Sequence, residues 1–74
     1  MVRKGSVIEL DDNNEYVVID MFEHKGNNII YLSDINNLGN VMYCTFNNDE
    51  LKKITDPDLL EEVIKLVNEH THNN

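Results

Sequence analysis

One cysteine and three histidines are the residue types in this chain that would support nucleophilic catalysis. The available pairs of nucleophile and base are Cys44 with each of His24, His70 and His72. Such catalysis requires the two groups to lie within hydrogen-bonding reach in a cleft. Cys44 falls inside an apolar run, residues 41–46, where a free cysteine behaves as a small buried hydrophobe. The sequence contains no P-loop, dinucleotide-binding or nucleophile-elbow motif. We therefore expect no catalytic residue, and we predict that the protein is not an enzyme.

Two short segments carry the residue types of metal ligands. His70 and His72 are separated by one residue near the end of the chain, but a closed zinc site also needs a third and a fourth ligand. Residues 11–15, Asp-Asp-Asn-Asn-Glu, are rich in oxygen ligands. They lack the glycine and the distant glutamate of a calcium-binding loop. The sequence therefore predicts neither a metal site nor a cofactor.

Aromatic and acidic side chains are the candidates for binding another protein. The aromatic candidates are Tyr16, Phe22, Tyr31 and Tyr43, which we expect on the sheet face opposite a barrel interior. The acidic candidates are Asp58, Glu61 and Glu62, which we expect on the exposed side of a C-terminal helix. Aromatic side chains are good interface anchors, and carboxylates suit a basic partner. The alternatives are that the aromatic residues form core beneath the helix and that the acidic ones are only solvated.

The charge balance limits the kinds of partner. Fourteen acidic residues against six basic ones give a formal net charge of −8. Direct binding to a phosphate backbone depends on lysine and arginine, so we expect no direct binding to nucleic acid or to an anionic membrane. A basic protein partner is electrostatically favoured, although acidity also serves solubility alone.

Cysteine usage and hydropathy suggest a compartment. A single cysteine excludes an intramolecular disulfide and fits a reducing environment. The apolar runs are too short to span a membrane, and no signal-peptide core follows the first residues. We predict a cytoplasmic protein.

Four Asn-Asn pairs divide the first part of the chain into short strands. They lie at positions 13–14, 27–28, 36–37 and 47–48. Asparagine tolerates the left-handed backbone region, so such pairs favour tight turns. The predicted strands cover about residues 6–10, 16–23, 29–33, 41–46 and 51–54. We expect a loose connection over residues 33–40, with Gly39-Asn40 as a turn signal.

The second predicted strand is apolar on both faces. One alternating set is Val17, Ile19 and Met21, which we assign to the barrel interior. The other set is Tyr16, Val18, Asp20 and Phe22, which we assign to the opposite face, together with Ile29 and Val41 of other strands. A strand of this kind must be covered on both sides.

A capped amphipathic helix is predicted over about residues 57–68. Asp56 is a good N-cap, and Pro57 suits the first helical position. The apolar stripe consists of Leu59, Leu60, Val63, Ile64 and Val67. We expect residues 69–74 to form a frayed tail.

These elements predict one mainly β (α+β) domain over residues 1–74. The expected fold is a five-stranded antiparallel meander that curls into an SH3-like barrel, with the C-terminal α-helix packed on it. The alternative is an open antiparallel sheet with the helix across one face.

Four segments of the chain resemble parts of known small proteins. They are Gly-Ser-Val-Ile-Glu-Leu, Tyr-Val-Val-Ile-Asp, Ile-Ile-Tyr-Leu and Asp-Pro-Asp-Leu-Leu, in that order. Their sequence resembles short bacterial and phage domains of unknown function, built from a strand meander and an acidic C-terminal helix. The resemblance implies a bacterial or phage setting and no activity or site residue.

The leading functional hypothesis is a non-enzymatic protein-interaction module, acting as a monomer or a homodimer. The alternative is an acidic inhibitor, encoded by a phage or mobile element, that imitates nucleic-acid charge on a host defence enzyme.

Overall fold

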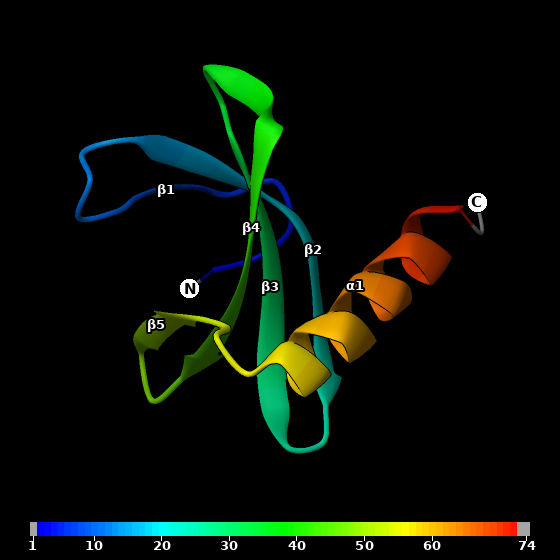
Figure 1. Ribbon diagram of the computed structural model, residues 1–74. Coiled ribbons are helices and arrows are strands. Elements are labelled where there is room, and N and C mark those ends of the chain that lie inside the picture. Colours follow the sequence, from blue (N-terminus) through cyan, green and yellow to red (C-terminus); the bar gives the residue numbers. More distant parts are fainter. Residues whose placement is uncertain (1, 73–74) are drawn as a thin grey trace.

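The computed structural model describes residues 2–72, which form five strands and one helix (Figure 1). The elements are β1 (Val7–Glu9), β2 (Glu15–His24), β3 (Asn27–Asp34), β4 (Asn37–Asn47), β5 (Glu50–Lys53) and α1 (Pro57–His72). Each strand pairs antiparallel with its neighbour in the chain, in the order β1-β2-β3-β4-β5. The sheet curls into a half-barrel, and α1 crosses one of its faces. The predicted fold class is confirmed.

Residues with a left-handed backbone conformation form the tight turns of this meander. Lys25 and Gly26 connect β2 to β3 with φ of 52° and 81°, and Asn48 and Asp49 connect β4 to β5 with φ of 54° and 61°. Positive φ at both central residues is the type I′ turn, whose twist matches that of the paired strands. Asn13, with φ of 64°, plays a similar part between β1 and β2. The turns predicted at Asn13-Asn14 and Asn47-Asn48 are confirmed, whereas Asn27-Asn28 lies in β3 and directly follows the turn formed by Lys25 and Gly26.

The connection between β3 and β4 differs from the prediction. Instead of a loose segment over residues 33–40, β3 continues to Asp34 and β4 begins at Asn37. The Asp34 carboxylate accepts the Asn36 backbone N–H at 2.8 Å and so stabilises a two-residue turn. Gly39 has no positive φ and lies inside β4, where the pairing jumps from Asp34–Asn37 to Ser33–Val41. The glycine therefore marks an interruption in strand pairing rather than a reversal of the chain.

A bulge at Ile19 decides which face of the sheet each residue of β2 occupies. Val18 pairs with Leu32 and Asp20 pairs with Tyr31, so Ile19 is an extra residue without a partner in β3. One extra residue exchanges the two faces for the rest of the strand. Tyr16 and Val18 therefore join Met21 on the inner face of the half-barrel, whereas Phe22 faces the helix. The prediction that placed Tyr16 and Val18 on the same face as Phe22 is wrong.

Two apolar clusters cover the two faces of the sheet. The inner cluster contains Tyr16, Val18, Ile30, Leu32 and Cys44. The outer cluster contains Ile29, Ile54, Val63 and Val67, with Phe22, Tyr31 and Tyr43 packed against it. The outer cluster is the contact between the sheet and α1.

The helix begins as predicted and ends later than predicted. The Asp56 carboxylate accepts the Asp58 N–H at 3.0 Å, which caps the first turn. The predicted end near residue 68 and the tail from residue 69 are wrong, because α1 continues to His72. His70 holds the last turn on the sheet: its Nδ1 lies 3.0 Å from Asp20 Oδ2, and its ring meets Phe22 edge-to-face at 4.7 Å. Residues 73–74 of the predicted tail lie outside the described part of the chain.

Candidate functional site

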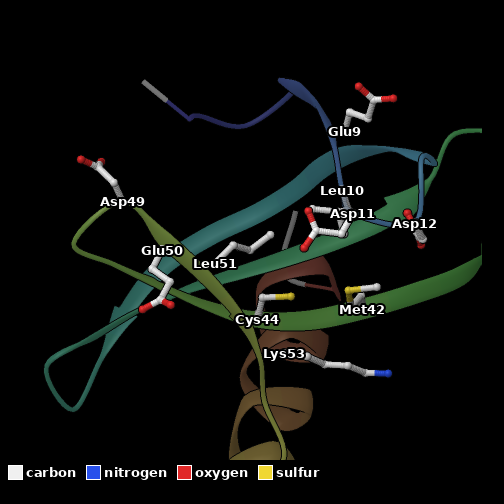
Figure 2. Close-up of a pocket in the computed structure, with 10 residues that line it drawn as sticks. All are labelled: Glu9, Leu10, Asp11, Asp12, Met42, Cys44, Asp49, Glu50, Leu51 and Lys53. Atoms are coloured by element: carbon white, nitrogen blue, oxygen red, sulfur yellow. The ribbon is translucent and has the colours of Figure 1, made fainter.

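A groove of about 470 Å³ lies between the two edges of the half-barrel (Figure 2). Its floor is apolar and consists of Leu10, Met42, Cys44 and Leu51. Its rim is acidic and consists of Glu9, Asp11, Asp12, Asp49 and Glu50. Lys53 is the single basic residue among the lining residues of this groove. The five rim residues are exposed, whereas each floor residue is buried or half-buried.

The loop between β1 and β2 supplies one side of the groove. Asp12 organises this loop, because its carboxylate accepts the Asn14 backbone N–H at 2.9 Å and the Tyr16 hydroxyl at 2.9 Å. The Asn14 N–H, with help from the Tyr16 hydroxyl, lowers the pKa of Asp12 despite partial desolvation. The same contact with Asp12 raises the pKa of Tyr16. The core residue Tyr16 thus helps to fix the Asp12 carboxylate beside the floor and favours its ionised form.

The hairpin of β4 and β5 supplies the other side. Its type I′ turn carries Asp49, and Glu50 follows directly at the start of β5. Glu50 lies 3.6 Å from the Lys52 ammonium, and both side chains are exposed. An exposed pair of this kind contributes little to stability, so the Glu50 carboxylate stays available to a partner.

Cys44 forms part of the floor, and its surroundings disfavour the thiolate at neutral pH. Its side chain is 1% exposed, and desolvation raises its pKa to about 11, an effect that nearby Lys53 only partly opposes. The thiolate is the reactive form of cysteine, so such a group is a poor nucleophile. His24 and His70, two of the three histidines that could have served as its base, instead contact Glu62 and Asp20. The side chain of His72 lies outside the described part of the structure.

The structure does not gather the four predicted aromatic residues on one surface. Tyr16 is 2% exposed in the inner cluster. Phe22, Tyr31 and Tyr43 are half-buried in the outer cluster. Tyr31 and Tyr43 stack with ring centroids 5.0 Å apart, and burial raises the pKa of Tyr43. The alternative of core beneath the helix therefore describes Phe22, Tyr31 and Tyr43, which are half-buried in the cluster with α1, whereas Tyr16 is core on the opposite face.

The three predicted acidic residues lie together on α1, but they have different surroundings. Asp58, Glu61 and Glu62 line a shallow hollow of about 400 Å³ with Lys65. Glu62 is already engaged, since His24 Nε2 lies 2.9 Å and Lys25 Nζ 3.0 Å from its carboxylate. Hydrogen bonds from His24 and Lys25 lower the pKa of Glu62. Glu62 therefore ties the helix to the turn between β2 and β3.

Asp20 is a polar site that the sequence analysis did not identify. Its side chain is 5% exposed and accepts the Met21 N–H at 2.9 Å, with His70 at 3.0 Å and Lys4 at 3.4 Å. Burial alone would raise the pKa of Asp20, but hydrogen bonds from Met21, His70 and Lys4 outweigh it and lower the pKa. The available signal was an aspartate within an apolar strand, since a buried carboxylate requires partners.

Part of the outer sheet face extends beyond the helix and is exposed. Val7 pairs with Val17, Val17 with Ser33, and Ser33 with Val41, which makes one row across four strands. Val7 and Val41 are exposed at the two ends of this row. Leu38, at the far end of the β3–β4 hairpin, is 69% exposed.

Among the described side chains, those of residues 2–71, no group of three or more histidine, cysteine, aspartate or glutamate residues is arranged to hold a metal ion. In the described part of the chain, the helix α1 lacks the length and apolar character needed to cross a membrane. No family model, curated protein or solved structure matches the chain.

Proposed function

We propose that this protein is a non-enzymatic interaction module that binds a cationic segment of another protein in the groove between β1 and β5. The observation that carries the proposal is an apolar floor surrounded by five carboxylates and one lysine. An uncovered apolar floor gains free energy when a partner excludes water from it. The carboxylates select a partner that brings positive charge.

The net charge of the chain supports the same partner class. A formal charge of −8 produces a field that attracts cationic segments and repels anionic ones over roughly one Debye length, about 8 Å at physiological salt. The groove adds short-range selection to this attraction, because its floor contacts apolar side chains. A partner that combines basic and aliphatic residues satisfies both parts.

The chemistry of the groove supports binding rather than catalysis. Its one thiol has a pKa raised to about 11, which leaves very little thiolate at neutral pH. The rim carboxylates are exposed, and exposed carboxylates lack the desolvated surroundings of a general acid.

Charge reversal in the groove tests the proposal, with a matched reversal on the helix as control. The probe is a fluorescent decapeptide of alternating lysine and valine, with binding followed by anisotropy at two salt concentrations. Asp11→Lys with Glu50→Lys should weaken binding at least about tenfold, because it places repulsive charge beside the floor. Glu61→Lys with Glu69→Lys changes the net charge equally on the exposed side of α1 and should weaken binding less than about threefold.

Three outcomes would overturn the proposal. The first is no binding of the lysine–valine peptide to the natural protein. The second is equal weakening by both charge reversals, which would leave only the long-range field. The third is equal affinity for a lysine–serine decapeptide, which would show that the apolar floor makes no contribution.

A further inference from the structure

We infer that the cationic segment binds as an added β-strand on the free edge of β5. This inference rests on the proposed function and specifies how the partner is recognised. It requires unpaired main-chain N–H and C=O groups on the edge of β5 and the apolar groove floor beside them. It also requires negative charge placed to meet alternate residues of an extended partner segment.

The register of the β4–β5 hairpin identifies the unpaired groups. The type I′ turn makes Asn47 and Glu50 a hydrogen-bonded pair, and antiparallel pairing alternates from there, so Thr45 and Lys52 form the next such pair. The Ile54 N–H donates to the Tyr43 carbonyl at 3.0 Å, which agrees with this alternation. The N–H and C=O groups of the intervening residues, Leu51 and Lys53, therefore point away from β4.

The same two residues line the groove. Leu51 and Lys53 both border the space that contains the floor and the acidic rim (Figure 2). Their free main-chain groups thus open beside the apolar surface. An extended segment placed there would gain main-chain hydrogen bonds from β5 and apolar contacts from the floor, which is the β-strand addition mode of peptide recognition.

The opposite edge of the half-barrel, β1, is also unpaired, so a seam between β1 and β5 stays open. On either side of β1, the Ser6 carbonyl accepts the Val18 N–H at 2.9 Å, and the Leu10 N–H donates to the Asn14 carbonyl at 3.1 Å. Antiparallel pairing alternates between these two bonds, so the main-chain N–H and C=O groups of Val7 and Glu9 point away from β2. β1 and β5 do not pair with each other, since the sheet order ends at both. The half-barrel therefore presents two strand edges along its seam, and the groove residues Glu9 and Leu51 come from the two sides.

Alternation also specifies the side chains of the partner. Successive residues of a strand point to opposite faces, so every second side chain would enter the groove toward Leu10, Met42 and Leu51. The remaining side chains would lie on the outside, where Glu9 and Glu50 expose their carboxylates. The structure thus favours an extended segment that alternates aliphatic residues with lysine or arginine.

Two variants at one position test for the main-chain contact. Lys53→Ala removes the side-chain charge and keeps the N–H, whereas Lys53→Pro removes both. Proline is tolerated on an edge strand where its missing N–H faces outward. The lysine–valine decapeptide should bind Lys53→Ala as well as or better than the natural protein, and Lys53→Pro about tenfold more weakly than Lys53→Ala. Equal affinities of two folded variants would overturn strand addition.

A scan on the peptide gives an answer even if Lys53→Pro fails to fold. N-methylation should weaken binding at alternate positions of the decapeptide and leave the positions between them nearly unchanged, because only alternate amides face β5. Uniform effects along the peptide would overturn the inference. If the scan is uniform while Asp11→Lys with Glu50→Lys still weakens binding, the proposed function stands and only the strand geometry fails.

Analytical ultracentrifugation of the natural protein tests whether a second copy of the chain occupies the same edge of β5. A dimer that Lys53→Pro abolishes and that the decapeptide does not displace would place another copy of the chain on β5. That result would overturn the cationic segment as its occupant.

Discussion

The two faces of the sheet are covered in different ways. One part of the outer face is covered by α1, with Val63 and Val67 buried in the same cluster as Ile29. The inner face is closed by the curl of the sheet itself, and the curl stops short at the seam between β1 and β5. A floor of half-buried apolar residues remains there, under an acidic rim. The difference suggests that the buried parts of both faces supply stability, whereas binding belongs to the open seam of the inner face.

Polar contacts strengthen this contrast. Near its two ends, α1 is held to the sheet by Glu62 with His24 and Lys25, and by His70 with Asp20. Each contact joins residues far apart in the sequence, so each fixes the tertiary position of the helix. At the groove, the contacts of Asp12 and of Glu50 with Lys52 are local along the chain or within one hairpin. The groove is therefore shaped by turns, and its rim is left unpaired across the seam.

The largest expected effect is on the free energy of unfolding when an outer-face residue is truncated. Ile29→Ala should lower it by about 3 kcal/mol, because it opens a cavity at a fully buried position. Leu51→Ala on the groove floor should lower it by about 1 kcal/mol, since that side chain is only half-buried. Urea denaturation measures both. Equal losses would contradict the contrast between a closed and an open face.

The second effect concerns the reactivity of Cys44. A pKa raised from 9.0 to about 11 lowers the thiolate fraction near pH 8 by about 100-fold relative to an ordinary thiol. Labelling with a thiol reagent should therefore be at least about 100-fold slower in the folded protein than in urea. The lysine–valine peptide should slow it further, because it covers the floor. Rapid labelling of the folded protein would show that the floor is solvated.

The smallest effect concerns the free energy of unfolding in acid, and it tests the contact of Asp20 with α1 on the outer face. The pKa of Asp20 is lowered in the folded protein, so its stabilising contribution is complete above the unfolded value, about 4, and is lost as the pH falls through the lower folded value. Asp20→Asn should lower the free energy of unfolding by about 1 kcal/mol near pH 7. Between pH 5 and pH 2 the variant should lose less stability than the natural protein, as measured by denaturation at each pH.

Asp12→Asn serves as the comparison for this titration. The pKa of Asp12 is also lowered, but by contacts within an exposed loop. If Asp12→Asn reduced the loss of stability in acid as strongly as Asp20→Asn, the helix contact would have no special part in acid stability.

Local patterns predicted most of the fold. The Asn-rich segments located turns, and Asp56 with Pro57 located the start of α1. The apolar stripe of the helix identified the residues that reach the sheet. Cys44 was recognised as a buried hydrophobe from its neighbours in an apolar strand. Each of these features depends on residues within a few positions of one another, and such interactions can be read along the chain.

Three features could not be read locally. The bulge at Ile19 moved Tyr16 and Val18 to the inner face, because the register is set by pairing with β3 rather than by alternation within β2. The last turn of α1 contacts the sheet through His70, whose Nδ1 lies 3.0 Å from the carboxylate of Asp20, fifty positions earlier in the chain. The groove collects residues from β1, β4, β5 and their loops, and no spacing in the sequence marks them as a group.

The sequence by itself determined the number and order of strands, the start of the helix, the acidity of the surface and the burial of Cys44. These follow from turn chemistry, periodicity and composition, which act over short distances. The tertiary structure alone decided which side of β2 is core, where the helix ends and where the sheet stays open. These depend on contacts between residues distant in the chain, and on a curl that brings β1 and β5 to one groove without pairing them.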